Sequence, residues 1–206
     1  MLIRLSTALD SDCWVNRQRS VRFTKTMSNL RKHITPIIRY AKKVTLIDPY
    51  MTCREERFFD TVQTIADLLG RYDGHQEPGV VHIHAGDPRA IGQETLQESV
   101  EDRLNRWETE LKPVVSHWQH KFRISLWGRK PNGKHLHDRY LITDQCGFDV
   151  PGGLDFLPDD DEARANQTTW SLLEYEDVQK IVWEEYHHSK SPYRYLGSRT
   201  VIPSQQ

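Results

Sequence analysis

The sequence lacks most features that fix a function by composition. Its three cysteines are odd in number and share no CxxC spacing, which argues against a CxxC redox or zinc motif and favours a reducing, cytoplasmic setting. No apolar run is long enough for a signal peptide or a membrane span, so we expect a soluble protein without a membrane partner. No internal repeat or low-complexity linker divides the chain.

Charge of either sign is also not in excess. Lysine and arginine total 28, aspartate and glutamate total 29, and the formal net charge is −1. A chain with this balance is not steered as a whole toward a polyanion, so any nucleic-acid or lipid-headgroup role depends on a local patch. The length of 206 residues suffices for one sizeable domain with a hydrophobic core, or for two small ones.

Strand-like and helix-like patterns alternate along the chain. Short β-branched or alternating runs predict strands at 44–47, 80–84, 121–127 and near 169–173. Apolar residues at helical spacing predict helices over 24–42, 55–71, 94–118 and 177–186, which Pro36 and Pro113 are placed to kink or break. This alternation predicts an α/β domain over residues 24–190, with an N-terminal arm (1–23) and a C-terminal tail (191–206).

A compact motif carries the chemistry. His137, Arg139 and Asp144 form the pattern His-x-Arg-x4-Asp, and Gly152-Gly153-Leu154-Asp155 follows after eight residues. An imidazole can attack phosphorus or donate a proton, a guanidinium can bind anionic oxygens, and a carboxylate can orient its neighbours. The apolar run at Tyr140–Ile142 indicates that the motif opens a buried strand. The pattern therefore favours chemistry on phosphate esters.

The motif resembles the signature of the phospholipase D superfamily, with arginine in place of the catalytic lysine. His137-Asp138-Arg139, Gly147-Phe148 and Gly153-Leu154-Asp155-Phe156 are similar to the phospholipase-D-like domain at the C-terminus of MIT-domain proteins and to its bacterial stand-alone relatives. Val44-Thr45-Leu46-Ile47-Asp48-Pro49-Tyr50 resembles the strand and turn before the first large helix of that group. The resemblance implies a single α/β domain with a mixed β-sheet and helices on both faces.

The resemblance also assigns roles. It implies that His137 attacks phosphorus, that Arg139 binds the phosphate and that Asp144 is the carboxylate of the motif. In catalytic members two such motifs meet, one histidine forms a phosphohistidine, the other protonates the leaving group, and no metal is needed. This chain departs from that pattern, since it has no second motif and carries Asp155 where the family has asparagine. It also has no MIT helices, so nothing implies that family's membrane-remodelling partners.

Plainer interpretations stand beside these. His137 and Arg139 would also fit a structural pair, with Arg139 bridging a nearby aspartate. His84 ends a strand before Gly86-Asp87 and would supply the missing second imidazole, although an exposed strand histidine, like His82, is the simpler expectation. A metal site that combines His135 and His137 with Asp144 and Asp155 matches no known ligand spacing, so we expect no metal and no other cofactor.

Basic residues adjoin the motif. Arg129, Lys130 and Lys134 lie in the loop before it and would bind a phosphodiester backbone, together with the glycines Gly152 and Gly153. A solvated turn would place the same residues there. Arg17, Arg19, Arg22 and Lys25 form a second basic run. Asp48 and Tyr50 end a strand at the edge where α/β sheets bind ligands, and a plain turn at Asp48-Pro49 explains them equally well.

We therefore expect a nuclease-type phosphodiesterase that acts on nucleic acid, as a homodimer that brings two copies of His137 together. By resemblance, a role in bacterial defence against mobile DNA is implied. A different class of function is a non-catalytic phosphate-binding module that docks on nucleic acid or acidic lipid headgroups. A third is an interaction subunit of a larger complex, with which the six tryptophans and eight tyrosines are compatible.

Overall fold

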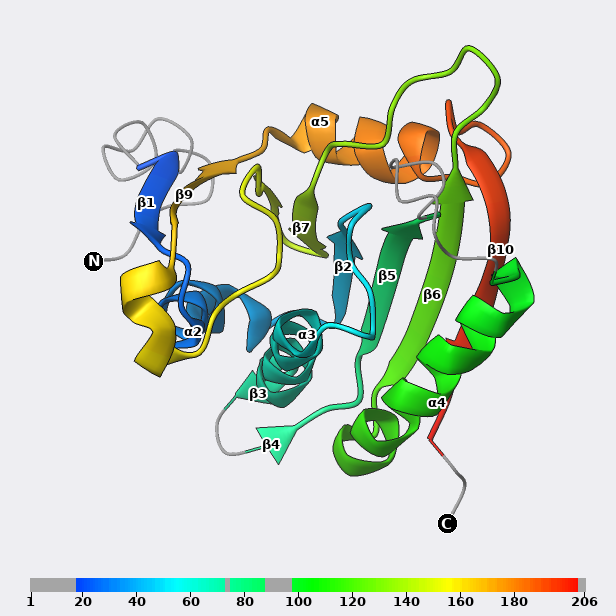
Figure 1. The fold of residues 1–206 in the computed structure, drawn as a ribbon. Coiled ribbons are helices and arrows are strands. Elements are labelled where there is room, and N and C mark those ends of the chain that lie inside the picture. Colours follow the sequence, from blue (N-terminus) through cyan, green and yellow to red (C-terminus); the bar gives the residue numbers. More distant parts are fainter. Residues whose placement is uncertain (1–17, 73–74, 88–97, 204–206) are drawn as a thin grey trace, which may run out of the picture.

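The computed structural model describes residues 18–72, 75–87 and 98–203, and within them it is built around an eight-stranded sheet (Figure 1). The strand order is β1-β9-β8-β7-β2-β5-β6-β10. The central strands β2, β5 and β6 are parallel to one another, and the other neighbours are antiparallel. The sheet is therefore mixed, with antiparallel strands on both sides of a parallel centre.

The elements have the following bounds. The large sheet contains β1 (Ser20–Thr24), β2 (Lys43–Ile47), β5 (Val80–Gly86), β6 (Lys121–Gly128), β7 (Tyr140–Thr143), β8 (Gly147–Asp149), β9 (Gln167–Leu172) and β10 (Arg194–Val201). The α-helices are α2 (Met27–Ile38), α3 (Glu56–Leu68), α4 (Val100–Trp118) and α5 (Tyr175–Lys180). A 3-10 turn η3 (Asp159–Arg164), a π-helical turn η4 (Ile181–Glu185) and a two-stranded ribbon of β3 (Arg71–Tyr72) and β4 (His75–Gln76) complete the list.

Helices cover both faces of the sheet. The larger core packs α2, α3 and α4 against one face, which is turned toward the viewer in Figure 1. Its members include Leu30, Ile34, Val62, Ile65, Leu104, Trp107, Leu46, Ile83 and Ile124. A smaller core on the opposite face packs η4 against the sheet, with Ile47, Trp127, Ile142, Ile181 and Tyr186. Alternate side chains of a strand point to opposite faces, so Leu46 belongs to the larger core and its neighbour Ile47 to the smaller one.

The predicted fold class is confirmed as α/β with a mixed sheet and helices on both faces. The prolines were expected to kink or break two helices, and neither helix is broken: α2 continues through Pro36 and α4 continues through Pro113. A proline inside a helix costs about 3 kcal/mol. Burial of the apolar residues beside each proline, such as Ile38 and Val114, offsets this cost and keeps each helix whole.

Both ends of the described chain join the sheet. The segment expected to be a C-terminal tail contributes β10, which pairs with β6 and contacts α4. The last residues of the expected N-terminal arm belong to β1, which pairs with β9. Pattern alone did not reveal β10, because its Arg194-Tyr195-Leu196-Gly197-Ser198 segment is only partly buried and has no clear alternation. Residues 1–17 lie outside the described residues.

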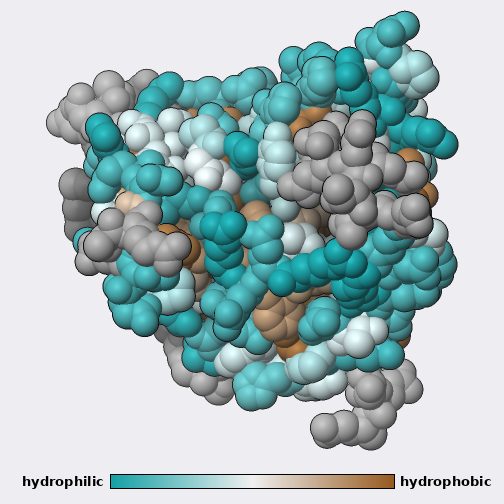
Figure 2. All heavy atoms as spheres, in the orientation of Figure 1, coloured by the Kyte–Doolittle hydropathy of each residue, from teal (hydrophilic) through white to brown (hydrophobic). Residues whose placement is uncertain are grey.

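None of the helices in the described segments is both long enough and apolar enough to cross a membrane. Figure 2 shows that hydrophilic side chains cover most of the face seen in Figure 1, and hydrophobic side chains appear there in small patches.

Two neighbouring residues test whether β10 is part of the folded core. Val201 is 4% exposed, whereas Ile202 is 64% exposed. We expect Val201→Asp to lower the free energy of unfolding by at least about 3 kcal/mol, because it removes a buried valine and buries a carboxylate. Ile202→Asp should change it by less than about 0.5 kcal/mol. Urea unfolding of both variants measures this, and equal stabilities would contradict the placement of β10.

Candidate functional site

Strand pairing brings three chain segments together at one edge of the sheet. β7 runs antiparallel to β2, with Ile47 opposite Tyr140, and β8 runs antiparallel to β7, with Tyr140 opposite Asp149. The carboxyl ends of β2 and β8 therefore meet the amino end of β7. The residues just beyond these ends are Asp48 to Tyr50, His137 to Arg139 and Val150 to Asp155. This register explains why residues about 90 positions apart in sequence form one site.

His137 is exposed and is held by a tyrosine. The Tyr50 hydroxyl lies 2.9 Å from Nδ1 of His137. The imidazole of His135 is stacked on that of His137 with 5.4 Å between ring centroids. Nε2 of His137 has no hydrogen-bond partner among the described residues, so this nitrogen is free to meet a ligand.

Arg139 is fixed on three sides. Its Nη1 donates to the carbonyl oxygen of Pro151 (2.7 Å), and its Nε lies 3.5 Å from Oδ1 of Asp48. The guanidinium also lies over the Tyr50 ring, 4.7 Å from the centroid, which is a cation–π geometry. Its Nη2 has no partner within the described part of the chain. Tyr50 therefore contacts both His137 and Arg139, and the two side chains share one small surface.

The buried carboxylate of Asp48 contacts all three segments of this edge. Its side chain is 1% exposed, Oδ1 accepts from the backbone N–H of Tyr50 (3.0 Å) and Oδ2 accepts from that of Leu154 (3.0 Å). The pKa of Asp48 is raised above its ordinary value, because the effect of burial exceeds the lowering effects of the two N–H groups and Arg139. One buried carboxylate thus joins the β2 turn, the glycine-rich turn and Arg139.

The glycine-rich turn is tightly packed against these groups. Gly153 has φ +78°, and a Cβ there would lie 3.2 Å from Oδ2 of Asp48 and 3.4 Å from Cδ of Arg139. A side chain at this position would be strained by the positive φ and crowded by these neighbours. The Gly153 N–H donates to the carbonyl oxygen of Val150 (2.9 Å) and the Gly152 carbonyl accepts from Lys25 (2.6 Å). In this arrangement both glycines shape the turn.

Asp155 is already paired with two cations. Its Oδ1 lies 2.6 Å from Nζ of Lys25, and its Oδ2 lies 3.3 Å from Nη1 of Arg57. The negative charge of Asp155 is therefore balanced within the protein. Lys25 had been assigned to a basic run near the N-terminus, and Arg57 in the first turn of α3 was not predicted. No local pattern in the sequence places either residue beside Asp155.

Asp144 lies at the other end of β7 from His137. Its carboxylate accepts from the backbone N–H groups of Lys42 (3.1 Å) and Lys43 (3.5 Å), where β2 begins. The four residues of β7 separate it from Arg139, and five steps along an extended chain span roughly 16 Å. In this structure Asp144 caps a strand start and is not grouped with the other motif residues.

His84 also lies apart from His137. Its side chain is 4% exposed and sits under η4, where Nδ1 accepts from Nε1 of Trp127 (2.9 Å). The His82 ring is 3.9 Å away between centroids. The expectation of an exposed strand histidine is wrong for His84, because η4 covers the face that the alternating run shares. Burial, then the nearby His82 and the cations Arg123 and Lys43, lower the pKa of His84 far below 6.5.

The basic loop contributes charge next to the motif. Lys130 donates to the carbonyl oxygen of Ser191 (2.7 Å), and Nε of Arg129 donates to that of Gly133 (3.1 Å). These carbonyls hold the side chains without neutralising them. Lys134 is exposed. All three cations remain available to an anion on the β6–β7 loop.

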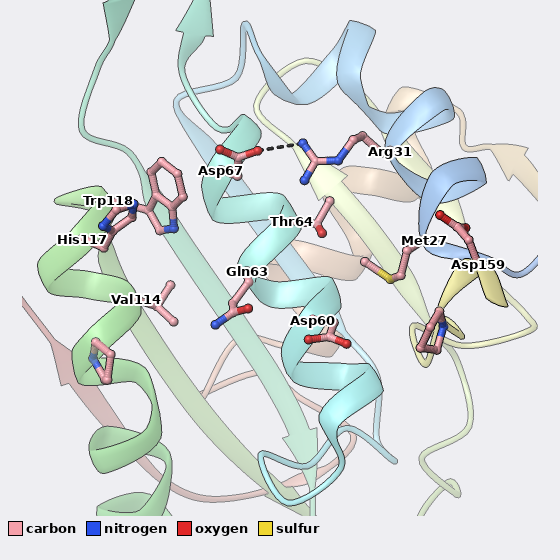
Figure 3. A pocket seen from close by; sticks show the side chains of 12 residues that line it. Met27, Arg31, Asp60, Gln63, Thr64, Asp67, Val114, His117, Trp118 and Asp159 are labelled. Carbon is pink, nitrogen blue, oxygen red and sulfur yellow. Dashed lines mark hydrogen bonds and ion pairs between the residues drawn. The ribbon is translucent and has the colours of Figure 1, made fainter. Parts of the chain in front are cut away.

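Other possible sites fit this chemistry less well. A cavity of about 780 Å³ lies between α2, α3 and α4 (Figure 3). Asp60, Asp67 and Asp159 line it, and Arg31 is paired there with Asp67 at 2.7 Å, so it does not favour a polyanion. No group of three or more histidine, cysteine or acidic side chains in the described residues could hold a metal ion. Of the four residues considered for a metal site, His135 and His137 are stacked, but Asp144 lies at the other end of β7 and Asp155 is paired with Lys25 and Arg57.

Comparisons with known proteins give little further information. No protein-family model matches the chain, and no curated protein matches it. Among solved structures, the chain is similar to TrmBL2, an archaeal chromatin protein whose structure shows a novel mode of DNA binding. The identity is 11%, the TM-score is 0.38, and the match covers 89% of this chain and 55% of that chain. A TM-score this low assigns neither a fold family nor a function.

Replacing Asp144 tests its role at the start of β2. We expect Asp144→Ala to lower the free energy of unfolding by about 1 kcal/mol, because two backbone N–H groups lose their acceptor. Phosphodiester binding by the folded variant should be unchanged. Asp160→Ala removes the same charge from an exposed residue of η3 and serves as the control. A loss of phosphodiester binding in Asp144→Ala alone would place this carboxylate in the site.

His82 provides a pH test. Burial, then the charges of Arg123 and Lys43, lower the pKa of His82 from 6.5 to about 3. Between these values the unfolded chain binds a proton that the folded protein does not, so stability falls as pH falls from 6.5 toward 3. We expect His82→Gln to lose stability less steeply than the wild type over this range. Urea midpoints at several pH values measure the slopes, and parallel slopes would contradict the placement of His82.

Proposed function

We propose that this protein is a nuclease-type phosphodiesterase that binds a nucleic-acid phosphodiester at the His137–Arg139 edge. The proposal is carried by one observation: His137 and Arg139 share the Tyr50 side chain, and each keeps a nitrogen, Nε2 and Nη2, without a partner in the described structure. A guanidinium binds two anionic oxygens with a planar fork, and an imidazole beside it reaches the phosphorus.

In the proposed reaction Nε2 of His137 attacks phosphorus, and a P–N bond forms as the ester P–O bond breaks. The leaving oxygen takes a proton from a second imidazole, which then accepts a proton from the water that hydrolyses the phosphohistidine. Attack requires that Nδ1–H of His137 donates to the Tyr50 hydroxyl, since only this tautomer leaves a lone pair on Nε2. Arg139 binds the phosphate oxygens throughout.

The second imidazole is proposed to come from a second copy of the chain. His84 is an unsuitable source, because it is buried under η4 and bonded to Trp127. His137 is exposed, so two copies can approach one phosphate across a homodimer interface. The loop with Arg129, Lys130 and Lys134 would then contact flanking phosphates of the nucleic acid, which makes binding sensitive to salt.

A second function follows if the donor and acceptor of the Tyr50–His137 hydrogen bond are exchanged. If the Tyr50 hydroxyl donates to Nδ1 of His137, the proton of the neutral imidazole lies on Nε2. That nitrogen can then donate to a phosphate oxygen and cannot attack phosphorus. The protein would in this case be a phosphate-binding module without turnover.

Turnover of single-stranded DNA and of bis(4-nitrophenyl) phosphate in the presence of a chelator tests the proposal. We expect His137→Ala to lower turnover by at least about 1000-fold, because the nucleophile is lost. Arg139→Ala should weaken DNA binding at all sequences and lower turnover, and Arg139→Lys should restore part of both. His117→Ala, which changes an exposed histidine in the last turn of α4 away from the candidate site, is the matched control and should behave like the wild type.

The outcomes separate the two functions. DNA binding that depends on Arg139 without any turnover, and that survives His137→Asn, supports the binding module and contradicts the enzyme. Binding and turnover that are both unchanged in His137→Ala and Arg139→Ala contradict any phosphate site at this edge.

A further inference from the structure

A second cavity lies on the opposite face of the sheet, under η4. Its volume is about 270 Å³. The floor is formed by β2, β5 and β6, and the wall by Val182, Trp183, Tyr186 and the two histidines that follow η4. None of the residues of the candidate phosphate site lines it.

The strand register arranges the floor in rows. Thr45, His82 and Arg123 lie opposite one another on adjacent strands, and Ile47, His84 and Ser125 form the next row. Trp127 lies one row further toward the carboxyl ends of the strands. Since side chains alternate between faces, these residues all face η4. The floor therefore changes from cationic at one end to aromatic at the other.

A hydrogen bond fixes the tautomer of His84. The indole N–H of Trp127 can only donate, so Nδ1 of His84 must be the acceptor in their 2.9 Å contact. Because burial keeps this histidine neutral, its proton lies on Nε2. Nε2 has no partner among the described residues, and the side chain lines the cavity. Nε2–H of His84 is therefore a hydrogen-bond donor for a ligand in this cavity.

A second polar group lies beside this donor. Nε2 of His82 is 2.9 Å from the Ser125 hydroxyl, which belongs to the same row as His84. Both residues line the cavity. A hydroxyl can donate and accept, so a ligand would meet a fixed donor and an adaptable group side by side. Such a pair suits the polar edge of a heterocyclic ring.

The charge of the cavity is positive. Lys43 and Arg123 line it and are exposed, and no acidic residue does so within the described chain. Arg123 belongs to the row of Thr45 and His82, and Lys43 lies two residues before Thr45 on β2, so both cations are at the same end of the floor. Lys43 and Arg123 would both attract an anionic group at this end of the cavity, and no acidic side chain that lines the cavity within the described residues would repel it.

Aromatic side chains form the rest of the enclosure. Trp127 and Tyr186 meet edge to face at 5.6 Å between centroids, and Trp183 stands at the opening with 58% of its surface exposed. The volume is just below the range of about 300 to 1000 Å³ that holds drug-sized ligands. A cavity of this size with aromatic walls suits a small molecule with a planar ring.

We propose that this cavity binds a small heterocyclic anion of the nucleoside monophosphate class. The ring lies among Trp127, Tyr186 and Trp183, with its polar edge at His84 and Ser125, and the phosphate lies at Lys43 and Arg123. This site goes beyond the proposed phosphodiesterase and does not require it.

Titration of the protein with AMP tests the proposal, using tryptophan fluorescence and calorimetry. Trp127 and Trp183 line the cavity, so binding should change the emission. We expect saturable binding with a Kd of about 1 mM or below. Adenosine, which lacks the charge, and inorganic phosphate, which lacks the ring, should each bind at least about tenfold more weakly.

Variants locate the bound nucleotide. Arg123→Gln should weaken AMP binding at least about tenfold, because it removes a charged contact from an exposed position without disturbing the core. Lys121→Gln makes the same charge change on the same strand outside the cavity and is the control. Ser125→Ala, a small change that the core should tolerate, should also weaken AMP binding.

Three results would overturn the proposal. The first is the absence of saturable AMP binding. The second is equal binding of AMP and inorganic phosphate, which would mean that no ring is recognised. The third is AMP binding that survives Arg123→Gln but is lost in Arg139→Gln, which would place the nucleotide at the phosphate site. Loss of phosphodiesterase activity in His137→Ala has no bearing on these results, so the two proposals fail independently.

Discussion

Asp48 is a nearly buried carboxylate whose oxygens accept backbone N–H groups from two separate turns, at Tyr50 and Leu154. A buried charge is stable only when its hydrogen bonds and a counter-charge are in place, and Arg139 supplies that charge. The geometry of the candidate site depends on this arrangement. It holds the β2 turn against the glycine-rich turn, positions Tyr50, and leaves the Arg139 side chain partly exposed.

Much of the fold could be predicted from local pattern. The run Val44–Ile47 predicted β2, and the apolar spacing within 55–71 predicted α3, because both patterns report directly on burial. β10 was missed, since its residues are half-exposed and it is held by pairing with β6 rather than by its own alternation. Pairing between distant strands leaves no local signal.

The same limit applies to the candidate site. The motif spacing pointed to His137 and Arg139, and the end of β2 pointed separately to Asp48 and Tyr50. Only the antiparallel pairing of β7 with β2 brings these four residues together. The alternating run Val80–His84 showed which face His82 and His84 share, but a sequence pattern does not say which helix covers that face. The pairing of Asp155 with Lys25 and Arg57 depends on three elements far apart in sequence.

The central claim is that His137 and Arg139 bind one phosphate group together. A crystal structure of the protein with tungstate, a stable mimic of phosphate, tests this most directly. The account predicts an anion at hydrogen-bond distance, about 3 Å, from both Nε2 of His137 and Nη2 of Arg139. Tungstate bound elsewhere with this edge empty, or a guanidinium that remains bonded only to Asp48 and Pro151 beside a bound anion, would contradict it.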